Sequence, residues 1–192
     1  MARNRNFDED EVVEKAVKLF WKQGYSKTSP DDLVNSLGLS RSSLYNTFGD
    51  KKELFLTSLK KYIDTKSKAL IESLDSSENA ENTITDILYS IIDHNQSENQ
   101  YGCLLINTTV EFFDQDESIR DLLTKNKLEI IEAISRLIYR GQKDNIIKNK
   151  ENPDKIAYFI YNNMIGLRVN VRGGANDNEL RTIVEMTKSI LK

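Results

Sequence analysis

A short polar segment, SRSSLYNTF at residues 40–48, carries the side chains with the clearest chemistry in this chain. If the segment is helical and turns Leu44 and Phe48 inward, its polar side chains share the outer face. Arginine donates two hydrogen bonds to guanine in the major groove of DNA, and hydroxyl and amide groups bind bases or phosphates. The segment therefore predicts a nucleic-acid interface. Its outward residues are Arg41, Ser42, Tyr45 and Asn46, with Ser43 beside them.

Two flanking positions are suited to contacts with DNA phosphates. Lys51 lies at the start of the next helix, where the ammonium group and the first backbone N–H groups can hold a phosphate together. Thr28, near the start of the preceding helix, can do the same on the other side. Taken singly, Arg41 or Lys52 would be interpreted as a solvated surface charge. The arrangement of the whole set in register favours the interface.

Two short helices joined by a tight turn are needed to position this face. Ser29 and Pro30 have the residue preferences of a helix start, and Gly38 ends that helix. Ser40 then caps the second helix. This pattern predicts a helix-turn-helix unit at about 29–48. Its inner seam is formed by Leu33, Val34, Leu37, Leu39 and Leu44.

The rest of the chain is also predicted to be helical. A first helix is expected at residues 8–23, and Asp50 caps a long one. Only two prolines and eight glycines occur in 192 residues, and short alternating strand patterns are missing. We therefore expect an all-α fold of about nine helices. The five later helices are expected at 80–96, 102–114, 117–144, 154–172 and 177–191, after a polar break at 75–82.

This organisation predicts a small N-terminal domain at 6–66, which contains the helix-turn-helix, and a larger helical domain at 67–192. Residues 1–62 carry 11 Lys and Arg against 9 Asp and Glu, whereas residues 63–192 carry 16 against 21. A mildly basic head on an acidic body has the sign expected for a head that meets phosphate. The net charge of −3 therefore does not argue against DNA binding.

Composition excludes several other classes of protein. No segment has the apolar length of a signal core or a membrane span, and the only cysteine, Cys103, fits a reducing cytoplasm. The only histidine is His94, so no zinc or other metal site is predicted. No arrangement of catalytic residues and no phosphate-binding glycine loop is present, so we predict neither an enzyme nor a cofactor. A helical adaptor is the alternative, but it leaves the polar face at 40–48 unexplained.

Residues 7–55 resemble the N-terminal domain of the TetR (tetracycline-repressor-like) family of bacterial transcriptional regulators. The resemblance rests on AVKLFWKQGYSKTSPDDL at 16–33, LGLSRSSLYNTF at 37–48 and GDKKELF at 49–55. It implies an all-helical, two-domain homodimer whose heads bind a palindromic operator in double-stranded DNA. It also implies that a small-molecule effector binds the body and releases the DNA, and that the regulator is a repressor.

The resemblance also identifies the positions that would face DNA. Ser42, Asn46 and Thr47 depart from the residues common in the family at their positions, which bears on the operator sequence rather than on the type of function. The residues that occupy the DNA-facing positions are Thr28, Ser40, Arg41, Ser42, Ser43, Tyr45, Asn46 and Lys51.

A second stretch, YGCLLINTTVEFFDQDESIR at 101–120, resembles one branch of the family in which Gly-Cys-Leu opens a helix of the ligand domain. Two interpretations of Cys103 stay open. Free cysteine is commonly a small buried apolar residue. A thiol at a helix N-terminus can instead be reactive towards oxidants and electrophiles. The second interpretation predicts that labelling of Cys103 weakens DNA binding.

The larger domain offers candidates for an effector pocket and for the dimer interface. The helices at 154–172 and 177–191 have more apolar positions than a single buried stripe needs, which favours a four-helix dimer interface formed by the last two helices of each subunit. Pocket candidates are aromatic or polar residues, although helical spacing more often places such residues in a core. They are Cys103, Asn107, Phe112, Phe113, Tyr139, Tyr158, Tyr161, Asn162 and Met164.

Overall fold

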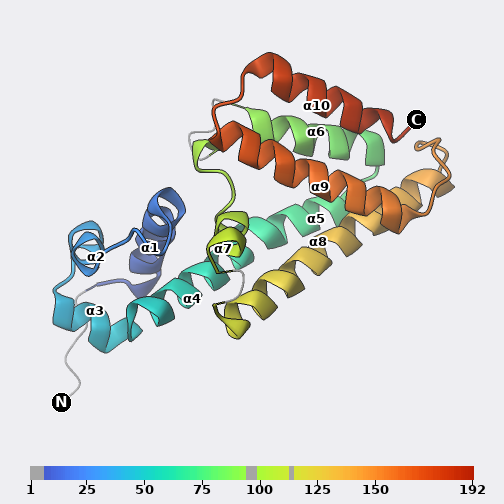
Figure 1. The fold of residues 1–192 in the computed structure, drawn as a ribbon. Coiled ribbons are helices and arrows are strands. Elements are labelled where there is room, and N and C mark those ends of the chain that lie inside the picture. The colour runs from blue at the N-terminus through green and yellow to red at the C-terminus, as the bar shows by residue number, and fades with distance from the viewer. Residues whose placement is uncertain (1–6, 94–98, 113–114) are drawn as a thin grey trace.

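The computed structural model describes residues 7–93, 99–112 and 115–192, and within these ranges it contains helices and no strand (Figure 1). His94 and Phe113 lie outside the described residues. The expected all-α fold is confirmed, with nine helices if α4, η1 and α5, which follow one another without a break, are counted as one. The helices are α1 (Glu9–Gln23), α2 (Pro30–Leu37), α3 (Arg41–Phe48), α4 (Lys51–Tyr62), the π-helical turn η1 (Ile63–Ser67), α5 (Lys68–Ser76), α6 (Ala80–Ile92), the 3-10 turn η2 (Asn99–Tyr101), α7 (Leu104–Phe112), α8 (Glu117–Lys143), α9 (Pro153–Arg172) and α10 (Asp177–Ser189).

Side-chain caps fix where the N-terminal helices begin. Ser29 Oγ accepts the Asp32 N–H at 3.1 Å, and the Asp32 carboxylate accepts the Ser29 N–H at 2.8 Å. Asp50 and Glu53 form the same reciprocal box at the start of α4. Gly38 has φ +69° and ψ 25°, a left-handed conformation that makes the turn between α2 and α3. The expected helix-turn-helix is confirmed.

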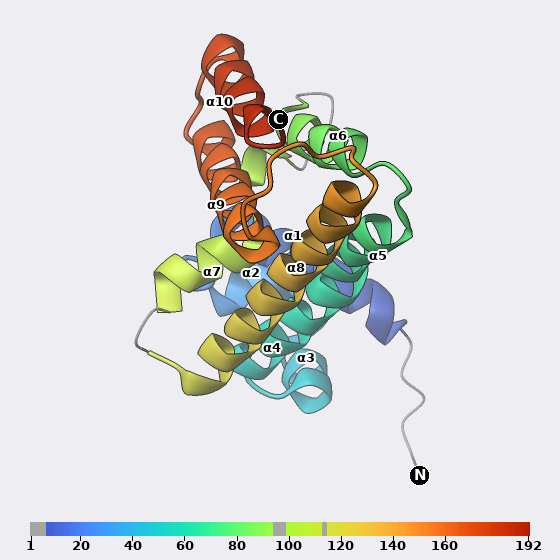
Figure 2. The same cartoon turned by 90° about the vertical axis from the view of Figure 1, so that its right-hand side faces the viewer.

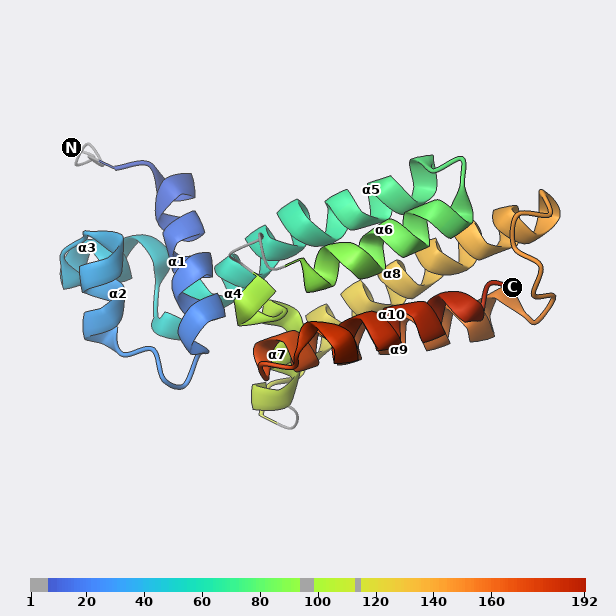
Figure 3. The same ribbon diagram turned by 90° about the horizontal axis from the view of Figure 1, so that it is seen from above.

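Helices α1–α3 form a head at one end of the molecule, and α4 leads from this head into a bundle of long helices (Figure 3). In the bundle, α8 packs against α5 and α9, and α10 packs against α6 and α9. Figure 2 shows α9 and α10 on one side of the bundle and α5 on the opposite side. Among the described helices, none combines the length and the apolarity that a bilayer crossing requires.

The loop between α5 and α6 is shorter than the expected break at 75–82. Helix α5 continues to Ser76 and α6 starts at Ala80, so only residues 77–79 form the loop. Arg140 explains the extension, because its guanidinium donates to the Leu74 carbonyl at 2.7 Å and so satisfies a carbonyl at the end of α5. The expected domain boundary between residues 66 and 67 falls within η1, inside an unbroken helical run.

The core has two parts, and they do not divide at residue 66. One part lies in the head, where Phe20, Leu33 and Leu44 are buried, but it extends to Leu104 of α7 and Ile119 of α8. The other fills the bundle between α5, α6, α8, α9 and α10. The start of α7 and the start of α8 are therefore packed against the head. This arrangement mechanically joins the head to two helices of the larger domain.

Candidate functional site

The outer face of α3 lies at the free end of the head (Figures 1 and 3). Arg41, Ser42 and Asn46 are exposed, and Tyr45 is partly exposed. The Arg41 guanidinium is 3.2 Å from the Asp31 carboxylate, and both side chains are largely in solvent. Exposed pairs of this kind contribute only about 0–1 kcal/mol, so Arg41 can exchange this partner for a DNA base at little cost.

Ser40 and Ser43 have a local structural role in addition to their surface position. Ser40 Oγ accepts the Ser43 N–H at 3.2 Å and contacts Ser43 Oγ at 2.9 Å. This contact satisfies one of the free N–H groups at the start of α3. The pair therefore fixes the start of the helix that carries Arg41.

The structure places two of the expected phosphate contacts differently from the sequence prediction. Thr28 is fully buried, and its hydroxyl donates to the Gly24 carbonyl at 2.6 Å. Its side chain therefore stabilises the turn after α1 and does not lie on the surface. Lys51 is half-buried, with Nζ 4.2 Å from the centre of the Tyr25 ring. Burial lowers the pKa of Lys51, whereas Glu111 and Asp32 oppose that shift.

Polar contacts tie the head to the start of α7 and α8. Glu111 of α7 accepts the backbone N–H groups of Tyr25 and Ser26, at 3.0 and 2.5 Å. Lys52 of α4 pairs with Asp116, the residue that caps α8. The hydrogen bond from Lys52 lowers the pKa of Asp116 well below its usual range, with Ser118 as the next contribution. These bonds hold the turn after α1 and the start of α4 against the larger domain.

An aromatic cluster lies beneath these polar contacts. The ring of Phe55 lies 4.9 Å from those of Phe20 and Tyr25 and 5.6 Å from Phe112 of α7. Phe112 also meets Tyr25 edge-on at 5.0 Å. Contacts of this geometry each add about 0.5–1.5 kcal/mol beyond the area that they bury. Movement of α7 therefore moves rings that belong to the head.

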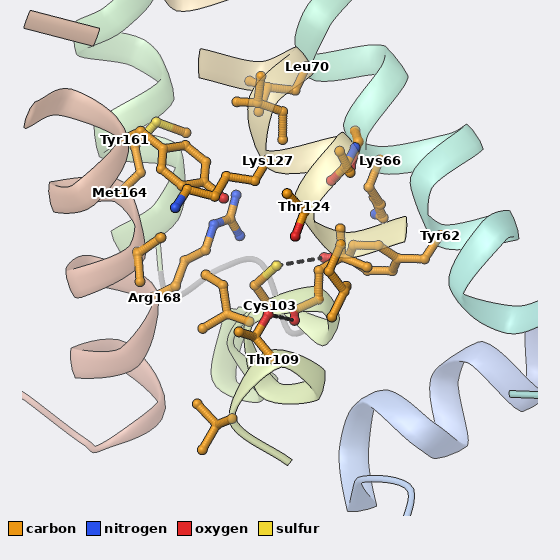
Figure 4. A pocket seen from close by; sticks show the side chains of 18 of the residues that line it. Tyr62, Lys66, Leu70, Cys103, Thr109, Thr124, Lys127, Tyr161, Met164 and Arg168 are labelled. Carbon is orange, nitrogen blue, oxygen red and sulfur yellow. Dashed lines mark hydrogen bonds between the residues drawn. The ribbon is translucent and has the colours of Figure 1, made fainter. Parts of the chain in front are cut away.

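A cavity of about 510 Å³ lies beside this joint, between the end of α4, α7, α8 and α9 (Figure 4). Its volume is in the range of about 300–1,000 Å³ that is usual for small-molecule sites. Its walls are largely apolar, with several polar and cationic side chains. The lining residues are Tyr62, Lys66, Ser67, Leu70, Cys103, Leu105, Ile106, Thr109, Val110, Phe112, Ile119, Arg120, Leu123, Thr124, Asn126, Lys127, Ile130, Tyr161, Met164, Ile165 and Arg168.

Only part of the predicted pocket set lines this cavity. Cys103, Phe112, Tyr161 and Met164 do so. The other candidates lie elsewhere for identifiable reasons. The Asn107 amide donates to the Tyr101 carbonyl at 3.0 Å. The remaining three are exposed on the outer faces of α8 and α9: Tyr139, Tyr158 and Asn162.

The polar residues that distinguish this cavity were not among the predicted pocket residues. Tyr62, Lys66 and Ser67 come from the end of α4 and from η1. Tyr62 and Lys66 lie in the segment assigned to the head, and Ser67 is the first residue assigned to the larger domain. Lys127 and Arg168 were passed over because charged residues on long helices are normally solvated. A π-helical turn is common at functional sites, but its presence could not be detected in the sequence.

Cys103 connects the cavity to the head. It directly precedes α7, and its carbonyl accepts the Asn107 N–H at 2.9 Å. Its Sγ lies 3.8 Å from the Tyr62 hydroxyl, which donates to it (Figure 4). Burial raises the pKa of Tyr62 well above its usual value, so this hydroxyl keeps its proton. Cys103 is half-buried, lines the cavity and also packs against the part of the core that lies in the head.

Trp21 completes the path from the cavity to α1. Its ring meets Tyr62 edge-on at 5.1 Å, and its Nε1–H donates to the Gly102 carbonyl at 3.1 Å in a buried position. Cys103, Tyr62 and Trp21 therefore form a continuous line of contacts from the cavity wall to the first helix of the head.

A helix-turn-helix head with an exposed polar second helix, joined to a helical body, defines a DNA-binding protein of the helix-turn-helix class. Residues 12–57 match the family model described as bacterial regulatory proteins, tetR family. Residues 82–186, more than half of the chain, match the model described as tetracyclin repressor-like, C-terminal domain. The chain belongs to the TetR family of transcriptional regulators.

Known relatives cover the whole chain. The HTH-type transcriptional regulator YezE of Bacillus subtilis (strain 168) is 28% identical over 194 residues, covering 100% of both chains. The HTH-type transcriptional repressor ComR of Escherichia coli (strain K12) is 26% identical, over 96% of this chain and 89% of its own. The solved structure of a cysteine mutant of the TetR family regulator CifR, in complex with 26 bp operator DNA, has a TM-score of 0.84 and 24% identity and covers 98% of each chain.

Proposed function

We propose that this protein is a transcriptional repressor that acts in the bacterial cytoplasm and binds a palindromic operator as a homodimer. The observation that carries the proposal is the exposed polar face of α3, with Arg41 and Asn46 in solvent at the free end of the head. ComR, which is similar over nearly the whole chain, is named a repressor. CifR, which has the same fold, has been solved on operator DNA.

The dimer interface in this proposal is formed by the outer faces of α9 and α10. Large apolar side chains are exposed there: Phe159 and Val169 on α9, and Met186 on α10. Burial of such residues between two copies would remove their apolar surface from water. A two-fold axis through this face would present two α3 helices to half-sites about 34–36 Å apart.

Release from DNA in this proposal begins at the cavity. A ligand between α7, α8 and α9, or a chemical group added to Cys103, would displace Tyr62, which lies against both Cys103 and Trp21. The shift would change the separation of the two α3 helices and so the match to the operator. A coupling free energy of about 1–3 kcal/mol is sufficient for a useful switch.

Fluorescence anisotropy with labelled DNA tests the operator proposal. The full-length protein is titrated into the intergenic DNA that flanks its own gene, at several salt concentrations, with random DNA of equal length as the control. We expect tighter binding to the flanking DNA, with an affinity that falls as salt increases. Equal and weak binding to both DNAs would contradict specific recognition at this site, and no binding at any salt would favour the helical adaptor.

Alkylation of Cys103 tests the thiol route separately. N-ethylmaleimide forms a thioether with Sγ, and no other cysteine competes for the reagent. We expect complete labelling, measured by mass spectrometry, to weaken operator binding. Cys103→Ser, treated in the same way, is the matched control and should bind DNA with or without the reagent. Full labelling with unchanged operator affinity would overturn the thiol route and leave ligand release as the proposal.

A further inference from the structure

The charges around the cavity all have one sign. Among the described residues that line it are the cations Lys66, Arg120, Lys127 and Arg168, and no aspartate or glutamate. Arg120 has a partner outside the lining set, since its guanidinium is 3.5 Å from Glu117. Within the described residues, Arg168 and Lys127 form no ion pair with a carboxylate. Arg168 and Lys127, two lining cations with no carboxylate partner among the described residues, favour a bound anion.

Arg168 is the cation placed deepest in the site. It is half-buried on α9, and its side chain extends into the cavity, on the same side as Tyr161 and Lys127 (Figure 4). Burial raises the pKa of both the Tyr62 and the Tyr161 hydroxyl, and the nearby charge of Arg168 partly offsets that rise. A guanidinium presents a planar fork that matches both oxygens of a carboxylate. The residue is therefore suited to hold one negatively charged head group.

Neutral hydrogen-bond donors also line the cavity. Burial raises the pKa of Tyr161 to about 12, so its hydroxyl stays protonated and is able to donate. Asn126 is 3% exposed, and its Oδ1 accepts from Ser67, whereas its Nδ2 has no hydrogen-bond partner. A buried amide donor without a partner is unfavourable, and a ligand oxygen that accepts its hydrogen bond would remove that cost. This donor is a second sign, independent of the charges, that a ligand with acceptor atoms completes the cavity wall.

The rest of the lining determines the other half of the ligand. Leu70, Leu105, Ile106, Met164 and Ile165 give the cavity an apolar surface that a hydrated inorganic anion would leave unfilled. We infer that the cavity binds an amphipathic carboxylate, with its head group on Arg168 and its hydrocarbon body against these apolar side chains of α5, α7 and α9. This inference rests on the proposed function, since it identifies the chemical class of the releasing ligand. Amines and quaternary ammonium compounds of similar shape are disfavoured by the same charges.

Isothermal titration calorimetry without DNA tests the chemical class, using three ten-carbon probes that differ only in charge: decanoate, 1-decanol and decylamine. We expect decanoate to bind more tightly than 1-decanol, and decylamine more weakly than either. Arg168→Gln should lower decanoate affinity roughly 10- to 100-fold, while 1-decanol binding stays the same and shows that the cavity is intact. Arg168→Lys keeps the positive charge but loses the planar guanidinium fork. Its affinity for decanoate should lie between those of the wild type and Arg168→Gln.

A matched pair of lysines on α8 separates cavity charge from general surface charge. Lys127→Gln removes a lining cation and should weaken decanoate binding a few-fold, whereas Lys125→Gln, outside the cavity, should have no effect. The inference is overturned if 1-decanol or decylamine binds as tightly as decanoate, or if decanoate shows no binding up to about 1 mM.

Addition of decanoate to the preformed operator complex, followed by anisotropy, tests the regulatory step alone. Release of the DNA supports both the ligand class and the proposed function. If decanoate binds in calorimetry but does not release the DNA, the proposed anion site is supported, and its control of DNA binding is contradicted.

Discussion

The outer face of α3 and the cavity of the larger domain are built in opposite ways. The face takes all its exposed polar side chains from one eight-residue helix, Arg41–Phe48. The cavity takes its walls from the end of α4, η1, α5, α7, α8 and α9, which are far apart in the chain. Residues on the face of α3 can therefore be substituted one at a time without repacking of the core. The cavity exists only after the larger domain has folded.

Substitutions in the two regions therefore affect function and stability differently. Arg41 and Asn46 are exposed, so their replacement changes binding and leaves the core intact. Cavity residues such as Met164 and Ile130 also belong to the bundle core. Changes there alter ligand binding and folding together. Clean tests of the cavity consequently use polar lining residues and not apolar ones.

The largest effect is expected from a change that disrupts the proposed dimer, because operator binding needs two subunits whereas ligand binding in the cavity needs only one. Phe159→Glu places a charge on the exposed apolar face of α9, where we propose that two copies meet. We expect a monomer by light scattering and a loss of operator affinity of about 100-fold or more, because two linked heads bind far more tightly than one. Decanoate binding should persist, since each subunit contains a complete cavity.

Tyr139→Glu is the control for this change, because Tyr139 is an aromatic residue on α8 that is even more exposed than Phe159 and lies outside the proposed interface. The Tyr139→Glu protein should remain dimeric and bind operator DNA. A dimeric Phe159→Glu protein would move the interface to another face.

The second effect concerns the face of α3 alone. The double change Arg41→Ala and Tyr45→Ala removes a proposed base contact and a proposed phosphate contact, each worth about 1–3 kcal/mol, so operator affinity should fall at least about 30-fold in anisotropy. The urea unfolding midpoint and ligand binding should stay the same. Lys18→Ala, an exposed cation on α1, is the comparison. Undiminished operator binding by the double variant would contradict the assignment of this surface.

A third, smaller effect tests whether the regions communicate. Trp21→Phe keeps an aromatic ring against Tyr62 but removes the Nε1–H bond to the Gly102 carbonyl. We expect a loss of about 0.5–1.5 kcal/mol in the free energy of unfolding, measured in urea. The ligand should also release less DNA at saturation, with its own affinity little changed. Normal release in this variant would exclude Trp21 as part of the connection.

The smallest effect depends on pH. The lowered pKa of Asp116 means that its bond to Lys52 stabilises the folded state above the ordinary carboxyl pKa of about 3.9, and that this stabilisation is lost as pH falls through the lower folded-state value. Asp116→Asn keeps a helix cap but removes the charge. Its melting temperature should lie slightly below that of the wild type at neutral pH, and the difference should shrink only under strongly acidic conditions. A constant difference down to the lowest pH would contradict this assignment.

The starts of the N-terminal helices and the exposed face of α3 could be predicted because their signals are local. Ser29, Gly38 and Asp50 act on neighbouring residues, so the sequence alone located the helix starts and the turn. The position of Thr28 could not be predicted in the same way. Its burial depends on the path of the chain between α1 and α2, which brings its hydroxyl to the Gly24 carbonyl.

The residues that line the cavity could be predicted only in part, because the identity of these residues depends on which helices pack together. Tyr158 and Tyr161 lie three residues apart on α9, yet Tyr161 lines the cavity and Tyr158 is 52% exposed. Helical periodicity groups such residues on one broad face and cannot decide which of them borders a gap. Arg168 was missed for a related reason, since the sequence contained nothing to distinguish a cavity cation from a solvated one.

The position of Trp21 has a further, practical consequence. It is the only tryptophan in the sequence, and it lies between Gly102 and Tyr62, where the head meets the cavity wall. Its intrinsic emission is therefore a reporter that comes from this joint alone, with no dye and no engineered label. The protein carries its own optical probe at the place where ligand occupancy and DNA occupancy would have to influence each other.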